Sequence, residues 1–194
     1  VNPDLPVKNV AELVAYAKAH PGKLNYSTGG AGTLPHLTAE LFKRLAGVDI
    51  VHVPYKGGGP SLTAVVAGET QMTFDTVATS IQMAEAGKLR ILAVVGPQRI
   101  AELPAVPAMP EAGFPSLTTG SWTALLAPRG TPPSIVANLN EAVNGALAIE
   151  PMKGTLARLG AQPRGGLPHV LADHMAAEQK KWKPIVADLN LKAD

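Results

Sequence analysis

The sequence repeats one device: a short apolar strand, a loop of small residues and then the start of a helix. In the first copy, residues 24–27 lead into a loop with three glycines, and Pro35 suits the first turn of the helix that follows. In the second copy, the β-branched run at 48–53 leads into another three-glycine loop and a helix entered at Pro60. Strands that alternate with helices at this pitch predict an α/β fold with a largely parallel, doubly wound sheet.

The rest of the N-terminal part extends this plan. Asn9 and Glu12 form a capping-box pattern, which predicts a helix that Pro21 ends. Residues 71–75 and 89–95 are typical of a third and a fourth strand, joined by a loop and a short helix. The second and fourth strands are rich in apolar side chains, as strands buried on both faces are.

The C-terminal part has a different pattern. A proline-rich stretch at 96–115 predicts a wrapping connection, and residues 121–127 form an extended apolar segment. Three helices are expected after it: one with an apolar stripe, one at 152–159 and the last from about His169. Pro184 is expected to kink or end the last helix, because proline lacks a backbone donor.

The predicted topology brings three loops to one place. Loops that leave the carboxyl ends of parallel strands open on one edge of the sheet, where ligands bind in such folds. Residues 27–34, 55–61 and 75–80 lie at these ends, and a helix start follows or falls within each loop. Free N–H groups at a helix start, together with its positive dipole end, favour an anion. The sequence therefore predicts a crevice for a small anion, and the alternative that the glycine loops are ordinary turns stays open.

Side chains in these loops have two readings each. The hydroxyls of Ser27 and Thr28 can donate to a carboxylate, or they can cap their own backbone. Asp75 can accept from an amino group of a ligand, but it would repel an acid and equally suits a loop or N-cap acceptor. Lys56 can steer anions towards the second loop, or it can be an ordinary solvated charge.

Two aromatic rings near these loops are expected to have structural roles. His36 lies one turn inside the first loop's helix, where we expect a partly exposed helix residue rather than a ligand contact. Trp122 is expected in the core or at a junction between lobes, with lining of the ligand cleft as the weaker alternative.

Several enzyme and cofactor classes lack their motifs. The chain has no Gly-x-Ser-x-Gly elbow, no dinucleotide fingerprint and no P-loop ending, so nucleotide cofactors and acyl transfer are not expected. His169 and His174 are five residues apart, which does not place them on one helical face, and no metal site is predicted. The sequence contains no cysteine, which excludes disulfides and zinc–thiolate sites.

Charge and hydropathy exclude other partners. A formal net charge of +2, with few and scattered aromatic residues, argues against binding of nucleic acid. The longest clear apolar run, residues 91–95, is far too short to cross a membrane. The N-terminus lacks the basic and apolar regions of a signal peptide, so any targeting segment is expected to be removed or absent. The hydrophobic content of 46% suffices for a core.

Four stretches of the chain resemble one family of receptors. They are LNYSTGGAGT at 24–33, VDIVHVPYKG at 48–57, AGKLR at 86–90 and WTALLAP at 122–128. The chain resembles the solute receptors of tripartite tricarboxylate transporters, the TctC or Bug family, over essentially its whole length. The resemblance implies a periplasmic, two-lobed binding protein of the type II Venus-flytrap class, which captures small mono- or dicarboxylates and delivers them to permease subunits in the membrane.

The resemblance also implies a division into lobes and a set of ligand residues. Residues 1–120 would form lobe two, and 121–194 would form the returning strand and C-terminal helices of lobe one, whose first part would precede Val1. The predicted ligand residues, which belong to the three loops, are Ser27, Thr28, Gly29, Gly30, Gly32, Thr33, Tyr55, Gly57, Gly58, Pro60, Asp75 and Thr76.

Three functional readings follow from these patterns. The first is a non-catalytic receptor for a small carboxylate, and the second is a small α/β enzyme acting on a carboxylated or phosphorylated metabolite. The third is a scaffold or assembly partner. If one lobe is incomplete, carboxylate binding should be weak, and exposed apolar helix faces in 121–194 should cause self-association.

Overall fold

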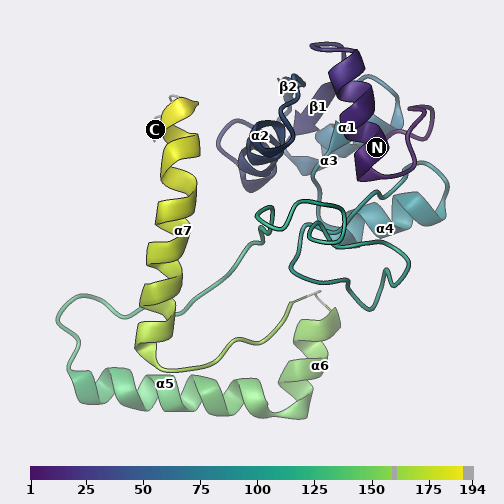
Figure 1. The fold of residues 1–194 in the computed structure, drawn as a ribbon. Coiled ribbons are helices and arrows are strands. Elements are labelled where there is room, and N and C mark those ends of the chain that lie inside the picture. The colour runs from purple at the N-terminus through teal and green to yellow at the C-terminus, as the bar shows by residue number, and fades with distance from the viewer. Residues whose placement is uncertain (159–160, 190–194) are drawn as a thin grey trace. The chain divides into compact units, whose positions relative to one another are not determined.

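The computed structural model describes residues 1–158 and 161–189. The chain divides into two compact units. Unit 1 comprises residues 1–121 together with the described residues from Ile185 onward, and unit 2 comprises residues 122–184. Figure 1 shows the strands and helices α1 to α4 in unit 1, and the helices α5 and α6 in unit 2.

Unit 1 alternates short strands with helices, as the sequence predicts. Its elements are α1 (Val10–Ala19), β1 (Asn25–Thr28), α2 (Leu34–Ala46), β2 (Val51–Pro54), α3 (Gly58–Val66), β3 (Met72–Thr73) and α4 (Val77–Glu85). The strands form one parallel sheet in the order β2-β1-β3, with Tyr26 opposite both His52 and Met72. The predicted α/β fold with a parallel sheet is confirmed.

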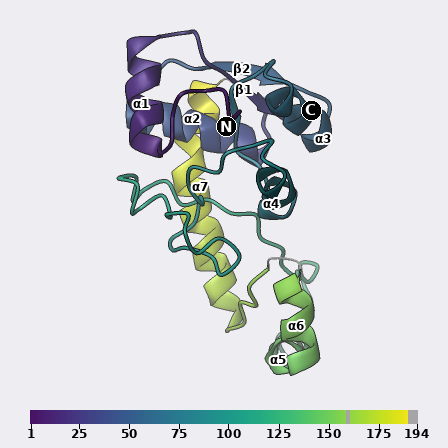
Figure 2. The same ribbon diagram turned by 90° about the vertical axis from the view of Figure 1, so that its right-hand side faces the viewer.

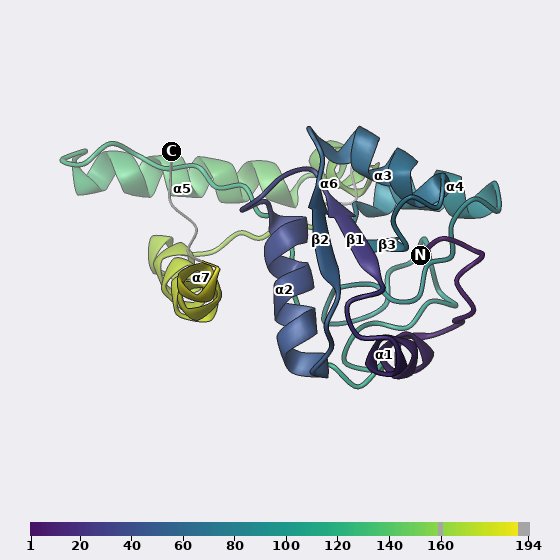
Figure 3. The same ribbon diagram turned by 90° about the horizontal axis from the view of Figure 1, so that it is seen from above.

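Helices cover both faces of this sheet. Successive side chains of a strand point to opposite faces, and the neighbours of β1 follow that rule. The hydroxyl of Tyr26 donates to Glu40 on α2, whereas Ser27 Oγ donates to the carbonyl of Ser61 on α3 at 3.0 Å. The sheet is therefore doubly wound, with α2 and α3 on opposite sides (Figure 3).

The core of unit 1 lies on the α1 and α2 side of the sheet and includes the proline-rich connection. The ring of Phe42 on α2 is 1% exposed, and its centroid lies 5.4 Å from that of Phe114 and 5.9 Å from that of Phe74. Leu117 is fully buried in the same cluster. The predicted wrapping connection thus closes the core of unit 1.

The helix ends of unit 1 follow the predicted chemistry. Asn9 caps α1 by accepting from the Glu12 amide at 2.8 Å, and the Glu12 carboxylate accepts in return from the Lys8 amide at 2.7 Å. Helix α2 ends at Gly47, whose φ of 63° is the left-handed conformation that glycine adopts without strain.

The fourth predicted strand is wrong, because the backbone of 89–95 has other partners. The Arg90 amide donates to the carbonyl of Val1 at 2.9 Å, and the Arg90 guanidinium donates to the carbonyls of Leu5 and Val7. Val94 forms only an isolated parallel bridge with Ala108. The segment is therefore tied to the N-terminus and the proline-rich connection rather than to β3.

Two other strand predictions need correction. The second strand was expected to be buried, but β2 is an edge strand with one neighbour, and Val51 is 44% exposed. The third strand is shorter than predicted, since only Met72 and Thr73 pair with β1. The loop expected through residues 76–80 is also short, because α4 begins at Val77.

Unit 2 contains the helices α5 (Pro133–Ala148), α6 (Glu150–Arg158) and most of α7 (Pro168–Asp188). Ile149 is extended, so α5 ends there and α6 starts in a new direction (Figures 1 and 2). The predicted end of α6 at Gly160 lies outside the described residues. Pro184 does not end α7, which continues to Asp188.

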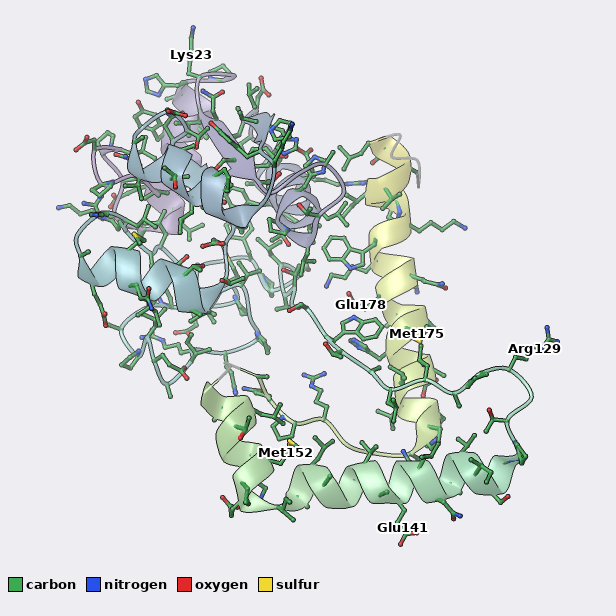
Figure 4. The ribbon with its side chains drawn as sticks, turned by 180° about the vertical axis from the view of Figure 1, so that it is seen from behind. Lys23, Arg129, Glu141, Met152, Met175 and Glu178 are labelled. Atoms are coloured by element: carbon green, nitrogen blue, oxygen red, sulfur yellow. The ribbon has the colours of Figure 1, made fainter. Side chains whose placement is uncertain are left out.

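The apolar segment 121–127 forms no strand in the part of the chain that the structure describes. Leu125 is 68% exposed and Leu126 is 67% exposed, so neither side chain is covered by a sheet or a helix. On α7, Glu178 accepts from the indole of Trp182 at 2.7 Å, and Met175 is 37% exposed (Figure 4). Among the described residues, no helix has both the length and the apolar character required to cross a membrane.

Candidate functional site

The first two loops meet at the carboxyl ends of β1 and β2. The Tyr55 amide donates to the carbonyl of Thr28 at 2.8 Å, and the Gly57 amide donates to the carbonyl of Gly29 at 3.0 Å. A Cβ atom on Gly29 would lie 3.0 Å from the backbone of Gly57 and of Gly58. Gly29 is therefore required because the second loop packs directly against it.

Other glycines of these loops are required by their backbone conformation. Gly30 has a φ of 142°, Gly32 of 76° and Gly57 of 109°, all in the region that L side chains rarely adopt. Gly58 has neither a positive φ nor a neighbour within 4 Å of an added Cβ. The first loop thus needs Gly29 for its close contact with the second loop, and it needs Gly30 and Gly32 for their positive φ.

The third loop follows β3, which pairs with β1 through Ser27 and Thr73. Asp75 Oδ2 accepts from Thr79 Oγ1 at 2.6 Å and from Ser80 Oγ at 3.2 Å. Thr76 Oγ1 lies 2.7 Å from Thr79 Oγ1. The carboxylate of Asp75 is therefore engaged by hydroxyls of α4, in keeping with the reading of Asp75 as a loop acceptor.

The helices that start at this edge lack the side-chain N-cap that α1 has. Asn9 caps α1, whereas α2, α3 and α4 have no side-chain cap, a feature shared with α5. Within the described residues, the amides of Ala31, Thr33, Gly58 and Gly59 have no hydrogen-bond acceptor. These N–H groups lie in the two loops that meet, so they supply unused donors at one edge of the sheet.

The two hydroxyls that the sequence singled out are engaged inside the protein. Ser27 is fully buried, and its hydroxyl donates to the carbonyl of Ser61. Thr28 is 1% exposed, and its Oγ1 lies 3.1 Å from the Gly30 carbonyl and 2.7 Å from His52 Nε2. Thr28 Oγ1 also accepts from the Gly30 amide at 3.2 Å. In this structure both hydroxyls hold the loops, and no proton of theirs is free to donate.

Three further predicted residues lie at the rim of the site. Thr33 Oγ1 donates to the Gly30 carbonyl at 2.7 Å, which closes the first loop on itself. The hydroxyl of Tyr55 donates to Glu69 at 3.2 Å. Pro60 is exposed in the first turn of α3, where its missing donor costs nothing.

His36 contradicts the expectation of a partly exposed residue. It is 5% exposed, and its Nδ1 accepts from the Gly32 amide at 3.0 Å. Its ring stacks on that of His52 with centroids 4.0 Å apart, and the His52 ring lies 4.8 Å from that of Tyr26. The expectation was wrong because the ring stacks on His52 and accepts a hydrogen bond from the glycine loop instead of facing solvent.

This stack, which we call the histidine column (Tyr26, His36 and His52), perturbs the titration of its members. Burial lowers the pKa of His36, and burial together with the charge of His36 lowers the pKa of His52 to about 4. Burial and the hydrogen bond to Glu40 raise the pKa of the Tyr26 hydroxyl. Both imidazoles are therefore neutral at neutral pH.

Sequence reasoning missed His52 altogether, although a signal existed. His52 alternates with Val51 and Val53 in a predicted strand, so its side chain had to point to one face of the sheet. Only the register, which places it opposite Tyr26, shows that this is the face carrying α2. Among the described residues, no group of three or more histidine, aspartate and glutamate side chains could hold a metal ion.

The chain matches a known family over nearly its full length. The family model described as tripartite tricarboxylate transporter family receptor matches residues 1–191. The chain belongs to this receptor family. BugT of Bordetella pertussis is 32% identical over 191 residues, and the UPF0065 protein in the tcbD-tcbE intergenic region of Pseudomonas sp. (strain P51) is 35% identical over 192. The chain is 98% covered in both matches and spans only 59% and 57% of the two relatives.

Solved structures of relatives have the same fold. Rpa4515 of R. palustris with adipate superposes with a TM-score of 0.81 at 39% identity, covering 96% of this chain and 62% of its own. MatC of Rhodopseudomonas palustris with bound malate gives a TM-score of 0.74 at 35% identity, covering 95% and 64%. The predicted periplasmic-binding-protein-like fold is therefore confirmed.

Proposed function

We propose that this receptor-family chain binds a small mono- or dicarboxylate at the edge where its first two loops meet. The observation that carries the proposal is the set of unused amides of Ala31, Thr33, Gly58 and Gly59 beside two uncapped helix starts. A carboxylate satisfies several such donors at once and complements the positive ends of both helices. The adipate and malate in the solved relatives support the same class of ligand.

The proposal assigns different roles to the predicted ligand residues. The backbones of the glycine loops would contact the carboxylate, with Gly30, Gly32 and Gly57 allowing the required turns. Ser27 and Thr28 would support these loops from inside, because their hydroxyls are already engaged. Asp75 and Thr76 would border the site at the start of α4, where the Asp75 carboxylate is engaged by the hydroxyls of Thr79 and Ser80.

The ligand class is tested by calorimetry on the 194-residue chain. The panel contains adipate and malate, with adipamide as a neutral match for adipate, and product analysis by NMR accompanies each titration. We expect saturable binding of the acids, no binding of the diamide and no product. Turnover of a bound acid would overturn the receptor proposal in favour of an enzyme, and absence of binding would favour a scaffold.

The affinity of this chain alone should be low. Each charge-assisted hydrogen bond contributes about 1.5–3 kcal/mol, and the loops of unit 1 supply contacts from one side of a ligand. Two such bonds correspond to about 3–6 kcal/mol, so we expect dissociation constants of roughly 1 mM.

We further propose that the protein acts in the periplasm and delivers its ligand to permease subunits in the membrane. In this scheme residues 1–120 form the ligand lobe, and residues 121–194 belong to the second lobe. The family model supports the transport role. Deletion of the gene should abolish uptake of the bound acid and leave uptake of an unrelated amino acid unchanged. Unaltered uptake of that acid would contradict the proposal.

A further inference from the structure

The glycine loop is tied to the histidine column by two of its amides. The Gly32 amide donates directly to His36 Nδ1 at 3.0 Å. The Gly30 amide donates to Thr28 Oγ1 at 3.2 Å, and that oxygen lies 2.7 Å from His52 Nε2. Each histidine thus holds one glycine of the loop, His36 directly and His52 through Thr28.

Engaged and unused amides alternate along this loop. The Gly30 amide donates to Thr28 and the Gly32 amide donates to His36. The amides of Ala31 and Thr33 have no acceptor among the described residues. Gly30 and Gly32 both have a positive φ, so this course of the loop backbone depends on glycine at the two positions whose amides are engaged. The donors left for an anion are those that the column does not use.

We propose that His36 and His52 are positioning residues, which fix the glycine loop so that the Ala31 and Thr33 amides are presented to the carboxylate. The inference rests on the proposed function of the loop, since it assigns a role within that site. Neither histidine contacts the ligand in this scheme. Their contribution is preorganisation, which raises affinity because the loop does not have to be ordered when the ligand binds.

The hydrogen bond from Gly32 also fixes the protonation state of His36. Since Nδ1 accepts, the proton of the neutral ring must lie on Nε2, and a second proton at Nδ1 would remove the acceptor. The charged and titratable groups around the ring are Glu40 and Lys43 on α2, Tyr26 on β1 and His52 on β2. Acidification should therefore release the Gly32 amide even without a ligand.

Two substitutions separate the acceptor from the ring. His36→Asn keeps an oxygen acceptor near the Nδ1 position and removes the stacked ring, whereas His36→Phe keeps a ring on His52 and removes the acceptor. His20→Phe is the matched control, because His20 also stacks on a tyrosine, with Tyr16 at 4.3 Å, but is exposed and makes none of its hydrogen bonds with the loop.

The direct readout is solvent exchange of the Gly32 amide, measured by NMR in the 194-residue chain. In His36→Phe we expect exchange at Gly32 at least about tenfold faster than in the wild type and adipate affinity about tenfold lower. His36→Asn should stay within about threefold of the wild type in both, and His20→Phe should match the wild type. In the wild type, acidification should lower the protection of the Gly32 amide, so that its exchange slows less than the fall in base-catalysed intrinsic exchange predicts.

Equal losses in His36→Phe and His36→Asn would overturn the proposal, since they would mean that only ring packing matters. Unchanged Gly32 exchange in His36→Phe would overturn it as well. If His36→Phe does not fold, His36→Gln replaces it, because its longer side chain places the acceptor away from the Gly32 amide and should behave like the loss. Failure of the wild type to bind any acid would refute the proposed function, while the exchange data would still judge the role of His36.

Discussion

Unit 1 and unit 2 differ in how much of their own apolar surface they bury. In unit 1, α1, α2 and α3 each contribute buried side chains to one or the other face of the sheet. In unit 2, α5 contributes none, and Leu125, Leu126 and Leu167 are each more than 60% exposed. The described helices of unit 2 leave apolar side chains exposed instead of enclosing them against one another, so the two units differ in what they need from their surroundings.

The comparison also separates two uses of polar side chains. In unit 2, Asn140 and Asn144 both donate to the carbonyl of Gly166, and Asn144 Oδ1 accepts from the Gly166 amide at 2.8 Å. These bonds fasten a connecting segment to α5. In unit 1, the equivalent bonds to Gly30 and Gly32 shape a loop whose remaining amides stay open. The same chemistry serves packing in one unit and, on our proposal, binding in the other.

The largest expected effect is on the free energy of unfolding, where a core substitution in unit 1 is compared with an exposed one in unit 2. Phe42→Ala should lower the free energy of unfolding by about 3–5 kcal/mol, because it empties the contact between three phenylalanine rings. Leu139→Ala on α5 should cost less than about 1 kcal/mol, since Leu139 is 46% exposed. Urea unfolding followed by circular dichroism measures both. A similar cost for the two would mean that unit 2 buries its stripe in solution.

The next effect sharpens the description of the two loops. Gly29→Ala should destabilise the chain by about 1–3 kcal/mol, because its methyl group would press on the backbone of Gly57 and Gly58. Gly58→Ala is the control and should change stability by about 0.5 kcal/mol or less, since nothing lies within 4 Å of its added Cβ. Thermal melts of both variants test this. Equal melting temperatures would show that the loops do not pack closely.

A smaller effect concerns acid. The folded pKa of His52, about 4, lies below the ordinary value of 6.5, so the unfolded chain binds more protons between these values. The stabilising contribution is complete above pH 6.5 and is lost as pH falls to about 4. Because the ring is partly exposed, we expect only about 1 kcal/mol. Urea unfolding of the wild type and His52→Gln from pH 7 to 4 measures it, and parallel pH profiles would contradict the assignment.

The smallest effect tests the exposed surface of unit 2. The double substitution of Leu125 and Leu126 by Ser should weaken self-association of the chain severalfold, because each leucine is about two-thirds exposed. Light scattering over a range of concentrations measures it, and Val51→Ser, at the exposed edge of unit 1, is the control. A wild-type chain that stays monomeric throughout would contradict the expectation of self-association.

The sequence was sufficient for elements whose signals are local. Asn9 with Glu12, Pro35 and Gly47 define helix ends through the chemistry of one turn, and these predictions are confirmed. The glycine loops could also be predicted, because a turn with positive φ favours glycine. The family could be predicted from four characteristic stretches of sequence. The fourth strand failed for the opposite reason. An apolar run forms a strand only if another backbone accepts its hydrogen bonds, and Arg90 and Val94 found other partners.

The ligand residues show the same division more sharply. The sequence determined that residues 27–34 and 55–61 lie at the carboxyl ends of parallel strands, since strands that alternate with helices are parallel and their carboxyl ends share one edge of the sheet. Only the tertiary structure decided that the Ser27 hydroxyl bonds to Ser61. The same holds for the Thr28 hydroxyl, which lies within hydrogen-bond distance of Gly30 and His52. The tertiary structure likewise decided that His36 is buried and accepts from the Gly32 amide. Such partners lie up to 34 positions away in the chain, and no local pattern records which face of a sheet a distant backbone will cover.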